Sequence, residues 1–309
     1  MLISLLMITV PMLTVIFFGN LCREKGTVPR EGVEGLKKLV TGVLLPAMVL
    51  GIFGSMQLSF STLLVPATSC LLCFFAYFIG TKTEKRMGEY GPTHRFLVSS
   101  AEPGMLGYAL FALLYGAENS APIALFDGGL AMFFFTFYLP RLSRAGGAGT
   151  EGKSALRTAA ESPILRMLVL GLILNLTGLY DKLMQTGAGE IVSATLSMLS
   201  TPVSCLMLFS VGYGMRIEKE TLAPVLKTSL CRLLAFLPLG GLGCLLLKRA
   251  GFGPAYTNAL LLFCCLPASY LVSAYITEEK QQRYANTQLS LHALISIVAT
   301  ILIKAFLPQ

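Results

Sequence analysis

Long, continuous runs of apolar residues limit this chain more than any other feature of its sequence. The run from Leu2 to Leu21 contains no charged residue, and similar runs follow at short intervals along the chain. A helix needs about 20 mostly apolar residues to cross the bilayer core, whereas the strands of membrane barrels alternate in segments of about ten residues. The sequence therefore predicts an all-α polytopic membrane protein.

Ten transmembrane helices account for these runs, and at about 20 residues each they leave only about 100 of the 309 residues for loops. Met1 to Leu21 lacks a basic start and a small-residue cleavage site, so we interpret it as the first span and not as a signal peptide. The predicted spans are Leu2–Leu21, Leu39–Met56, Phe60–Gly80, Phe96–Gly116, Ala121–Leu139, Pro163–Tyr180, Ile191–Met215, Thr228–Leu247, Ala259–Ile276 and Leu289–Leu307.

The composition excludes several classes of protein. Hydrophobic residues make up 54% of the chain and charged residues 13%, where a soluble domain has about 25% charged residues. An ordinary soluble enzyme, a disordered chain and a nucleic-acid binder are therefore excluded, although the net charge is +8. We predict no enzyme, because the only histidines are His94, expected in a loop, and His292, and because hydrolase motifs are missing. No nucleotide-binding motif is present, so transport driven by ATP is not expected.

The lysines and arginines predict the orientation in the membrane. Alternate loops hold eighteen of them on one side and four on the other. An excess of basic residues marks the cytoplasmic side, so both termini are expected outside the cell membrane. We interpret the basic loops as determinants of topology and contacts to lipid headgroups. The Cys70-x-x-Cys73 spacing is interpreted as small apolar packing, and no metal site is predicted.

A Gly-rich linker at residues 141–162 divides the predicted spans five and five. This division predicts a first five-helix repeat over residues 1–140 and a second over residues 163–309. Because each half has an odd number of spans, the second repeat would be inverted relative to the first, as in many secondary transporters.

Matched prolines support this repeat. Pro46 and Pro202 lie in the second span of each half, and Pro103 and Pro267 lie in the fourth. Proline removes a backbone donor and clashes with the preceding turn, so spans four and nine are predicted to be broken crossover helices. The N-terminal ends of their halves would offer N–H groups to an anion, and the C-terminal ends would offer carbonyls to a cation or substrate.

Glu102 is the strongest single candidate, because a carboxylate within a span is costly and usually marks a pathway. It is expected to carry a proton, to bind Na⁺ or to satisfy the backbone of the broken helix. Asp127 could join that network or cap a helix, and His292 could shuttle protons or bond a carbonyl. Asn286, Thr287 and Gln288 are expected where the helix of the tenth span begins, either as polar loop groups or as part of a gate. The predicted substrate and ion site comprises Glu102, Pro103, Gly104, Met105, Pro267, Ala268, Ser269, Asp127 and His292.

Several motifs resemble those of the auxin efflux carrier family, whose members include auxin exporters and malonate carriers. The best stretch runs from Ala101-Glu-Pro-Gly-Met-Leu-Gly-Tyr108 through Leu114-Tyr-Gly-Ala117 to Phe126-Asp-Gly-Gly129. Leu45-Pro-Ala47, Ser200-Thr-Pro202 with Gly212 and Gly214, and Leu266-Pro-Ala268 also look like family positions. One departure is Glu102, which stands where the family usually has Asn.

The resemblance implies a scaffold of spans 1, 2, 6 and 7 and a moving domain of spans 3–5 and 8–10. We therefore expect a secondary transporter of a small organic anion, such as an auxin-like acid or a dicarboxylate, with an elevator motion. H⁺ or Na⁺ is expected as the coupling ion, and a Na⁺ ion would lie near Glu102. No other cofactor is expected. The expected partners are the anion, the lipid bilayer and a second copy in a homodimer, with no nucleic acid. A sodium-coupled bile-acid-type symporter and a non-transporting receptor are the alternatives.

Overall fold

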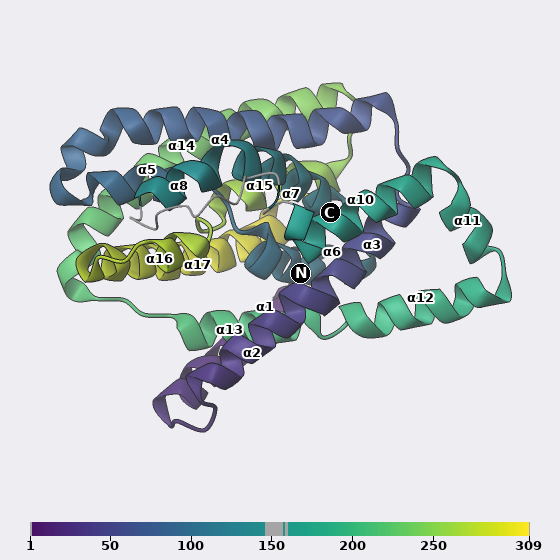
Figure 1. The fold of residues 1–309 in the computed structure, drawn as a ribbon, viewed down its shortest axis with the longest axis horizontal. Coiled ribbons are helices and arrows are strands. Elements are labelled where there is room, and N and C mark those ends of the chain that lie inside the picture. The colour runs from purple at the N-terminus through teal and green to yellow at the C-terminus, as the bar shows by residue number, and fades with distance from the viewer. Residues whose placement is uncertain (1, 146–156, 158–159, 309) are drawn as a thin grey trace. The chain divides into compact units, whose positions relative to one another are not determined.

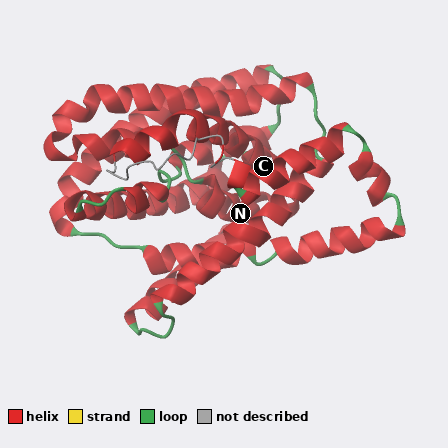
Figure 2. Ribbon diagram, viewed as in Figure 1, coloured by secondary structure: helices red, strands yellow, loops and turns green. Residues whose placement is uncertain are grey.

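A computed structural model describes residues 2–145, 157 and 160–308 of the chain. Every regular element among these residues is a helix, as Figure 2 shows. This confirms the all-α class predicted from the sequence. The predicted linker at residues 141–162 lies for most of its length, at residues 146–156 and 158–159, outside the described residues.

Several helical stretches are long and apolar enough to cross a membrane, which fits a multi-pass membrane protein. In the described part of the chain six satisfy both conditions: Arg30–Ser55, Phe60–Ser99, Ala121–Ala145, Gly187–Gly214, Lys219–Arg249 and Glu279–Phe306. Shorter apolar helices cover Pro103–Tyr115, Pro163–Leu176 and Pro254–Cys265. The count of ten spans and the inverted repeat stay predictions.

The chain forms two compact units, and each draws on both halves of the sequence. The first unit comprises residues 1–59, 104–124 and 159–214. Its helices, labelled in Figure 1, are α1 (Leu2–Glu24), α2 (Arg30–Leu39), α3 (Leu45–Ser55), α6 (Tyr108–Tyr115), α10 (Pro163–Leu176), α11 (Leu179–Met184), α12 (Gly187–Ser200) and α13 (Val203–Gly214), with a π-helical segment at Val40–Leu44.

Small residues let the backbones of the first unit approach closely. Helix α1 packs along α13, and a Cβ added to Gly212 would lie 2.0 Å from the Ile16 carbonyl oxygen. Helix α3 packs along α10, where the Asn175 side-chain amide donates to the carbonyls of Phe53, Gly54 and Met56 at 2.6–3.0 Å. These contacts satisfy carbonyls that the end of α3 leaves without helical partners.

The second unit comprises residues 60–103, 125–158 and 215–309. In it α4 packs on α5 and on α14, and α14 packs on α15 and α17. Its helices are α4 (Leu64–Thr83), α5 (Gly91–Ser99), most of α7 (Ala121–Phe133), α8 (Leu139–Ala145), α14 (Leu222–Arg249), α15 (Pro254–Cys265), α16 (Leu271–Tyr275) and α17 (Glu279–Phe306), with a π-helical segment at Phe134–Tyr138.

Some predicted boundaries are wrong. The tenth span was expected from Leu289, but α17 begins at Glu279, so that Asn286, Thr287 and Gln288 lie inside the helix. An apolar run marks the part of a helix that lipid or core surrounds, and the helix itself can continue through polar residues. His94 lies on α5, not in a loop. It is buried and hydrogen-bonded to Thr83 and Thr228 at 2.9 and 2.8 Å.

Two interruptions position the candidate site. The chain leaves helical geometry at residues 100–102, between α5 and the π-helical segment Pro103–Gly107, and again at residues 266–270, between α15 and α16. We call these the first break and the second break. The first break adjoins Pro103 and the second contains Pro267, and each of these prolines lacks a backbone N–H and has a ring that clashes with the preceding turn.

Candidate functional site: two helix breaks and a buried arginine

Glu102 lies in the first break and contacts the second. Its side chain is half-buried, and its carboxylate Oε2 accepts a hydrogen bond of 3.0 Å from the Tyr270 backbone N–H. Ser269, one of the predicted site residues, is buried beside Tyr270, and its hydroxyl accepts from the Leu271 N–H at 3.3 Å. The backbone donors at the start of α16 are therefore already bound by side chains of the chain itself.

A second link between the breaks runs through Ser100. Its hydroxyl accepts a hydrogen bond from the Ser269 backbone N–H at 3.1 Å and donates to the Tyr138 hydroxyl at 2.9 Å. Tyr138 in turn donates to the carbonyl of Phe96 at 3.0 Å. All four residues lie in the second unit, so the structure brings the two breaks together within one compact body.

Arg232 binds the C-terminal ends of α5 and α15, the helices that precede the two breaks. It lies on α14, is fully buried at 0% exposure, and its guanidinium faces the last carbonyls of α5 and α15. Nη1 donates to Leu97 and Val98 at 3.0 and 3.1 Å. Nε and Nη2 donate to the Leu266 carbonyl at 3.2 and 2.8 Å. The group also lies over the Phe236 ring, 4.6 Å from its centroid.

Sequence reasoning missed this arginine. The predicted eighth span, Thr228–Leu247, contains Arg232, to which the sequence analysis gave no role. The signal was available, because an ionisable residue within a membrane span is a functional hypothesis by default, the same argument that singled out Glu102. What the sequence could not supply was the partners, which lie 34 to 135 residues away along the chain.

The breaks therefore carry two charges of opposite sign at chemically matched positions. Helix C-terminal ends carry partial negative charge, and here they face a guanidinium. A backbone N–H at the start of a helix favours an anion, and here it faces a carboxylate. Either charge would be costly within a membrane without such partners.

His292 is buried on α17, and its ring lies beside the Cys265 carbonyl and within electrostatic range of Arg232. Neither ring nitrogen makes a hydrogen bond of normal geometry among the described residues. The same holds for the side-chain amide of Gln288, one helical turn earlier. Buried polar groups normally have partners, and these two side chains lie one turn apart on the same face of α17.

The other predicted site residues divide between the units. Pro103, Pro267 and Ala268 are buried in the second unit. Asp127 is half-buried on α7, next to Phe126, whose carbonyl accepts a hydrogen bond of 2.8 Å from Ser69 of α4. Gly104 and Met105 fall in the first unit.

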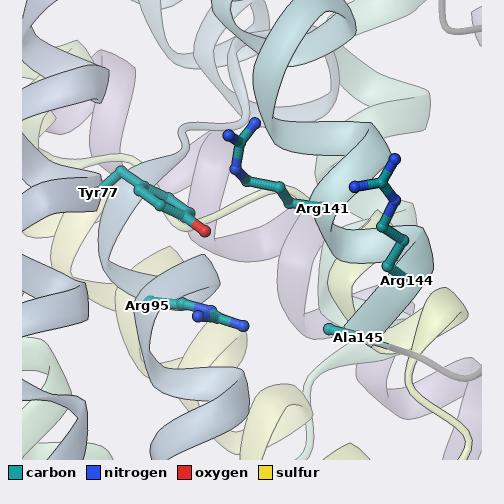
Figure 3. Close-up of a pocket in the computed structure, with 5 residues that line it drawn as sticks. All are labelled: Tyr77, Arg95, Arg141, Arg144 and Ala145. Carbon is teal, nitrogen blue, oxygen red and sulfur yellow. The ribbon is translucent and has the colours of Figure 1, made fainter.

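A basic cavity lies elsewhere in the second unit. Its volume is about 330 Å³, and Tyr77, Arg95, Arg141 and Arg144 line it together with Ala145, as Figure 3 shows. Arg95 forms an ion pair with Glu84, with N and O 3.5 Å apart. These arginines lie on α5 and α8, in the stretches whose basic residues predict the cytoplasmic side, so we interpret them as topology determinants and not as the substrate site.

Comparison with known proteins decides the family. A family model described as membrane transport protein matches residues 4–304, which is nearly the whole chain. The chain belongs to this family, the auxin efflux carriers. It is also similar to a protein of Methanothermobacter thermautotrophicus described as an uncharacterized transporter, with 25% identity over 192 residues. That match covers 60% of this chain and 63% of the relative's length. The resemblance stated from the motifs is confirmed.

Proposed function

We propose that this membrane transport protein is a secondary transporter that carries a small organic anion across the cell membrane. The substrate class is a carboxylate, such as an auxin-like acid or a dicarboxylate. The observation that carries the proposal is the pair of helix breaks, bound to each other within one unit, with Glu102 at a backbone N–H and Arg232 at the carbonyls. Broken helices that meet at one point are a common substrate site in secondary transporters.

Glu102 provides a route to proton coupling. The ionised carboxylate occupies the Tyr270 N–H, one of the donors that a substrate carboxylate would use, and its charge would repel that substrate. Protonation removes the repulsion and weakens the hydrogen bond, because a neutral acid is a poorer acceptor than a carboxylate. Binding of the anion is then linked to uptake of a proton at Glu102. Na⁺ paired to the carboxylate would have the same effect on the charge.

The division of the chain supports an elevator-type motion. One unit contains the helices of predicted spans 1, 2, 6 and 7, and the other contains those of spans 3, 5, 8, 9 and 10. The fourth span is shared, since residues up to Pro103 belong to the second unit and residues from Gly104 to the first. The family resemblance implies this scaffold and this moving body, except that it assigns the whole fourth span to the moving body.

The experiment measures electrical currents from proteoliposomes on a solid support. Malonate, indole-3-acetate and other short acids are added at two pH values, with Na⁺ or with choline, to the wild type and to Glu102→Gln. We expect currents that depend on pH in the wild type and that lose this dependence in the variant. Glu190→Gln, which changes an exposed acid on α12, is the matched control and should behave as the wild type.

The outcomes separate the alternatives. Currents that require Na⁺ and vanish in Glu102→Gln would favour a sodium-coupled symporter of the bile-acid type. Specific binding of an acid without current or counterflow of labelled solute would favour a receptor. If Glu102→Gln keeps the wild-type pH dependence, the carboxylate is a structural cap and the coupling mechanism proposed here is wrong.

A further inference from the structure

The carbonyls at the two helix breaks are of the kind that transporters use to hold a metal cation. An α-helix leaves its last four carbonyls without helical partners, and at a break within the membrane these must be satisfied by protein or by a water-filled cavity. In this chain the carbonyls of Leu97, Val98 and Leu266 all accept hydrogen bonds from one guanidinium, that of Arg232.

The charges at this position balance. Each helix C-terminal end corresponds to about −0.5 of an elementary charge, so the ends of α5 and α15 together offer about −1. A monovalent cation is the partner that neutralises them. Among the described residues the ion pairs join other side chains, and no carboxylate lies within ion-pair distance of Arg232. The guanidinium is therefore matched by the two helix ends.

The shape of the group also fits. A guanidinium has five N–H donors in a plane, so that it can bind acceptors on two sides at once. Arg232 uses one edge for Leu266 and the opposite nitrogen for Leu97 and Val98, with all four distances between 2.8 and 3.2 Å. A lysine ammonium would supply the same charge from a single point and could not span the two ends in this manner.

We propose that Arg232 is a resident cation, which fills the position where the carbonyls of the two broken helices would otherwise hold an alkali-metal ion. Transport at this site then requires no Na⁺. The inference rests on the transport function proposed above and removes the carbonyls of Leu97, Val98 and Leu266 as a Na⁺ site for that function. Because the cation is covalently attached to α14, it stays with the second unit throughout any motion of that unit.

A first test uses the unmodified protein. The melting temperature of the purified wild type is measured in NaCl and in choline chloride at equal ionic strength. A metal ion at about 100 times its Kd would raise the melting temperature by several degrees. We expect no difference between the salts. A rise specific to Na⁺ that persists in Glu102→Gln would overturn the proposal.

Chemical rescue provides the second test. Arg232→Ala should melt several degrees below the wild type, and millimolar methylguanidinium should restore part of the loss. Tetramethylammonium at the same concentration carries the charge without any N–H donor and should restore nothing. Arg249→Ala, which changes an exposed arginine at the end of the same helix, should respond to neither cation. Equal responses of Arg232→Ala to both cations would overturn the proposal.

Arg232→Lys covers the case in which the alanine variant does not fold. The lysine keeps the positive charge but loses the planar guanidinium. We therefore expect the variant to fold without Na⁺ and to melt at a lower temperature than the wild type. A Lys variant as stable as the wild type would show that the fork is not needed, and would contradict the assignment. Both melting tests need no substrate. If no acid in the panel gives a current while rescue succeeds, the assignment of Arg232 stands and the transport function fails.

Discussion

Single side chains link the two breaks by hydrogen bonds, and Ser100 is the smallest of these side chains. Ser100→Ala removes the acceptor of the Ser269 N–H and the donor to Tyr138 with little change in volume. A buried donor left without a partner costs about 1–3 kcal/mol, so we expect the variant to unfold at a lower temperature by several degrees. Thermal unfolding in detergent measures this. Ser55→Ala changes an exposed serine bonded only within its own helix and should leave the unfolding temperature nearly unchanged.

Glycines let some helices of this protein pack closely. At the contact of α1 with α13 the space beside one glycine is too small for a Cβ atom. Gly212→Ala would place a Cβ 2.0 Å from the Ile16 carbonyl oxygen, and forcing the backbones apart costs about 1–3 kcal/mol. Gly214→Ala is the matched control, because a Cβ there meets nothing within 4 Å and alanine favours helix. Comparing the two melting temperatures tests the packing. A Gly212→Ala variant as stable as Gly214→Ala would contradict it.

The charge distribution predicts the orientation of the whole molecule in the membrane. With ten spans and eighteen basic residues in the loops assigned to the cytoplasm, the C-terminus is predicted outside. A fusion of alkaline phosphatase to Gln309 should therefore be active in cells, and a fusion of green fluorescent protein there should be dark. The reverse pattern would show an odd number of spans or an inverted orientation. The predicted homodimer is checked by the mass of the purified protein in detergent.

The sequence by itself determined the helical class, the membrane environment and the place of both breaks. Lipid admits only segments that satisfy their own backbone, so an apolar run of sufficient length implies a helix. Proline disfavours a helix locally, and the matched positions of Pro103 and Pro267 in the two halves pointed to the breaks, although Pro11 and Pro238 lie inside continuous helices. Glu102 was found because a carboxylate in an apolar run stands out against its neighbours.

Only the tertiary structure decided what the breaks contact. The Tyr270 N–H reaches Glu102 across 168 residues, and Arg232 reaches Leu97 across 135. Such pairings depend on how α5, α14 and α15 pack, which periodicity does not encode. The sequence predicted that the carbonyl ends would face a cation or a substrate, but it did not indicate that the Arg232 guanidinium of the chain itself binds them. The sequence shows which residues are charged or interrupt a helix, because these are properties of single residues. The hydrogen-bond partners of a buried charge depend on how distant helices pack, so only the tertiary structure shows them.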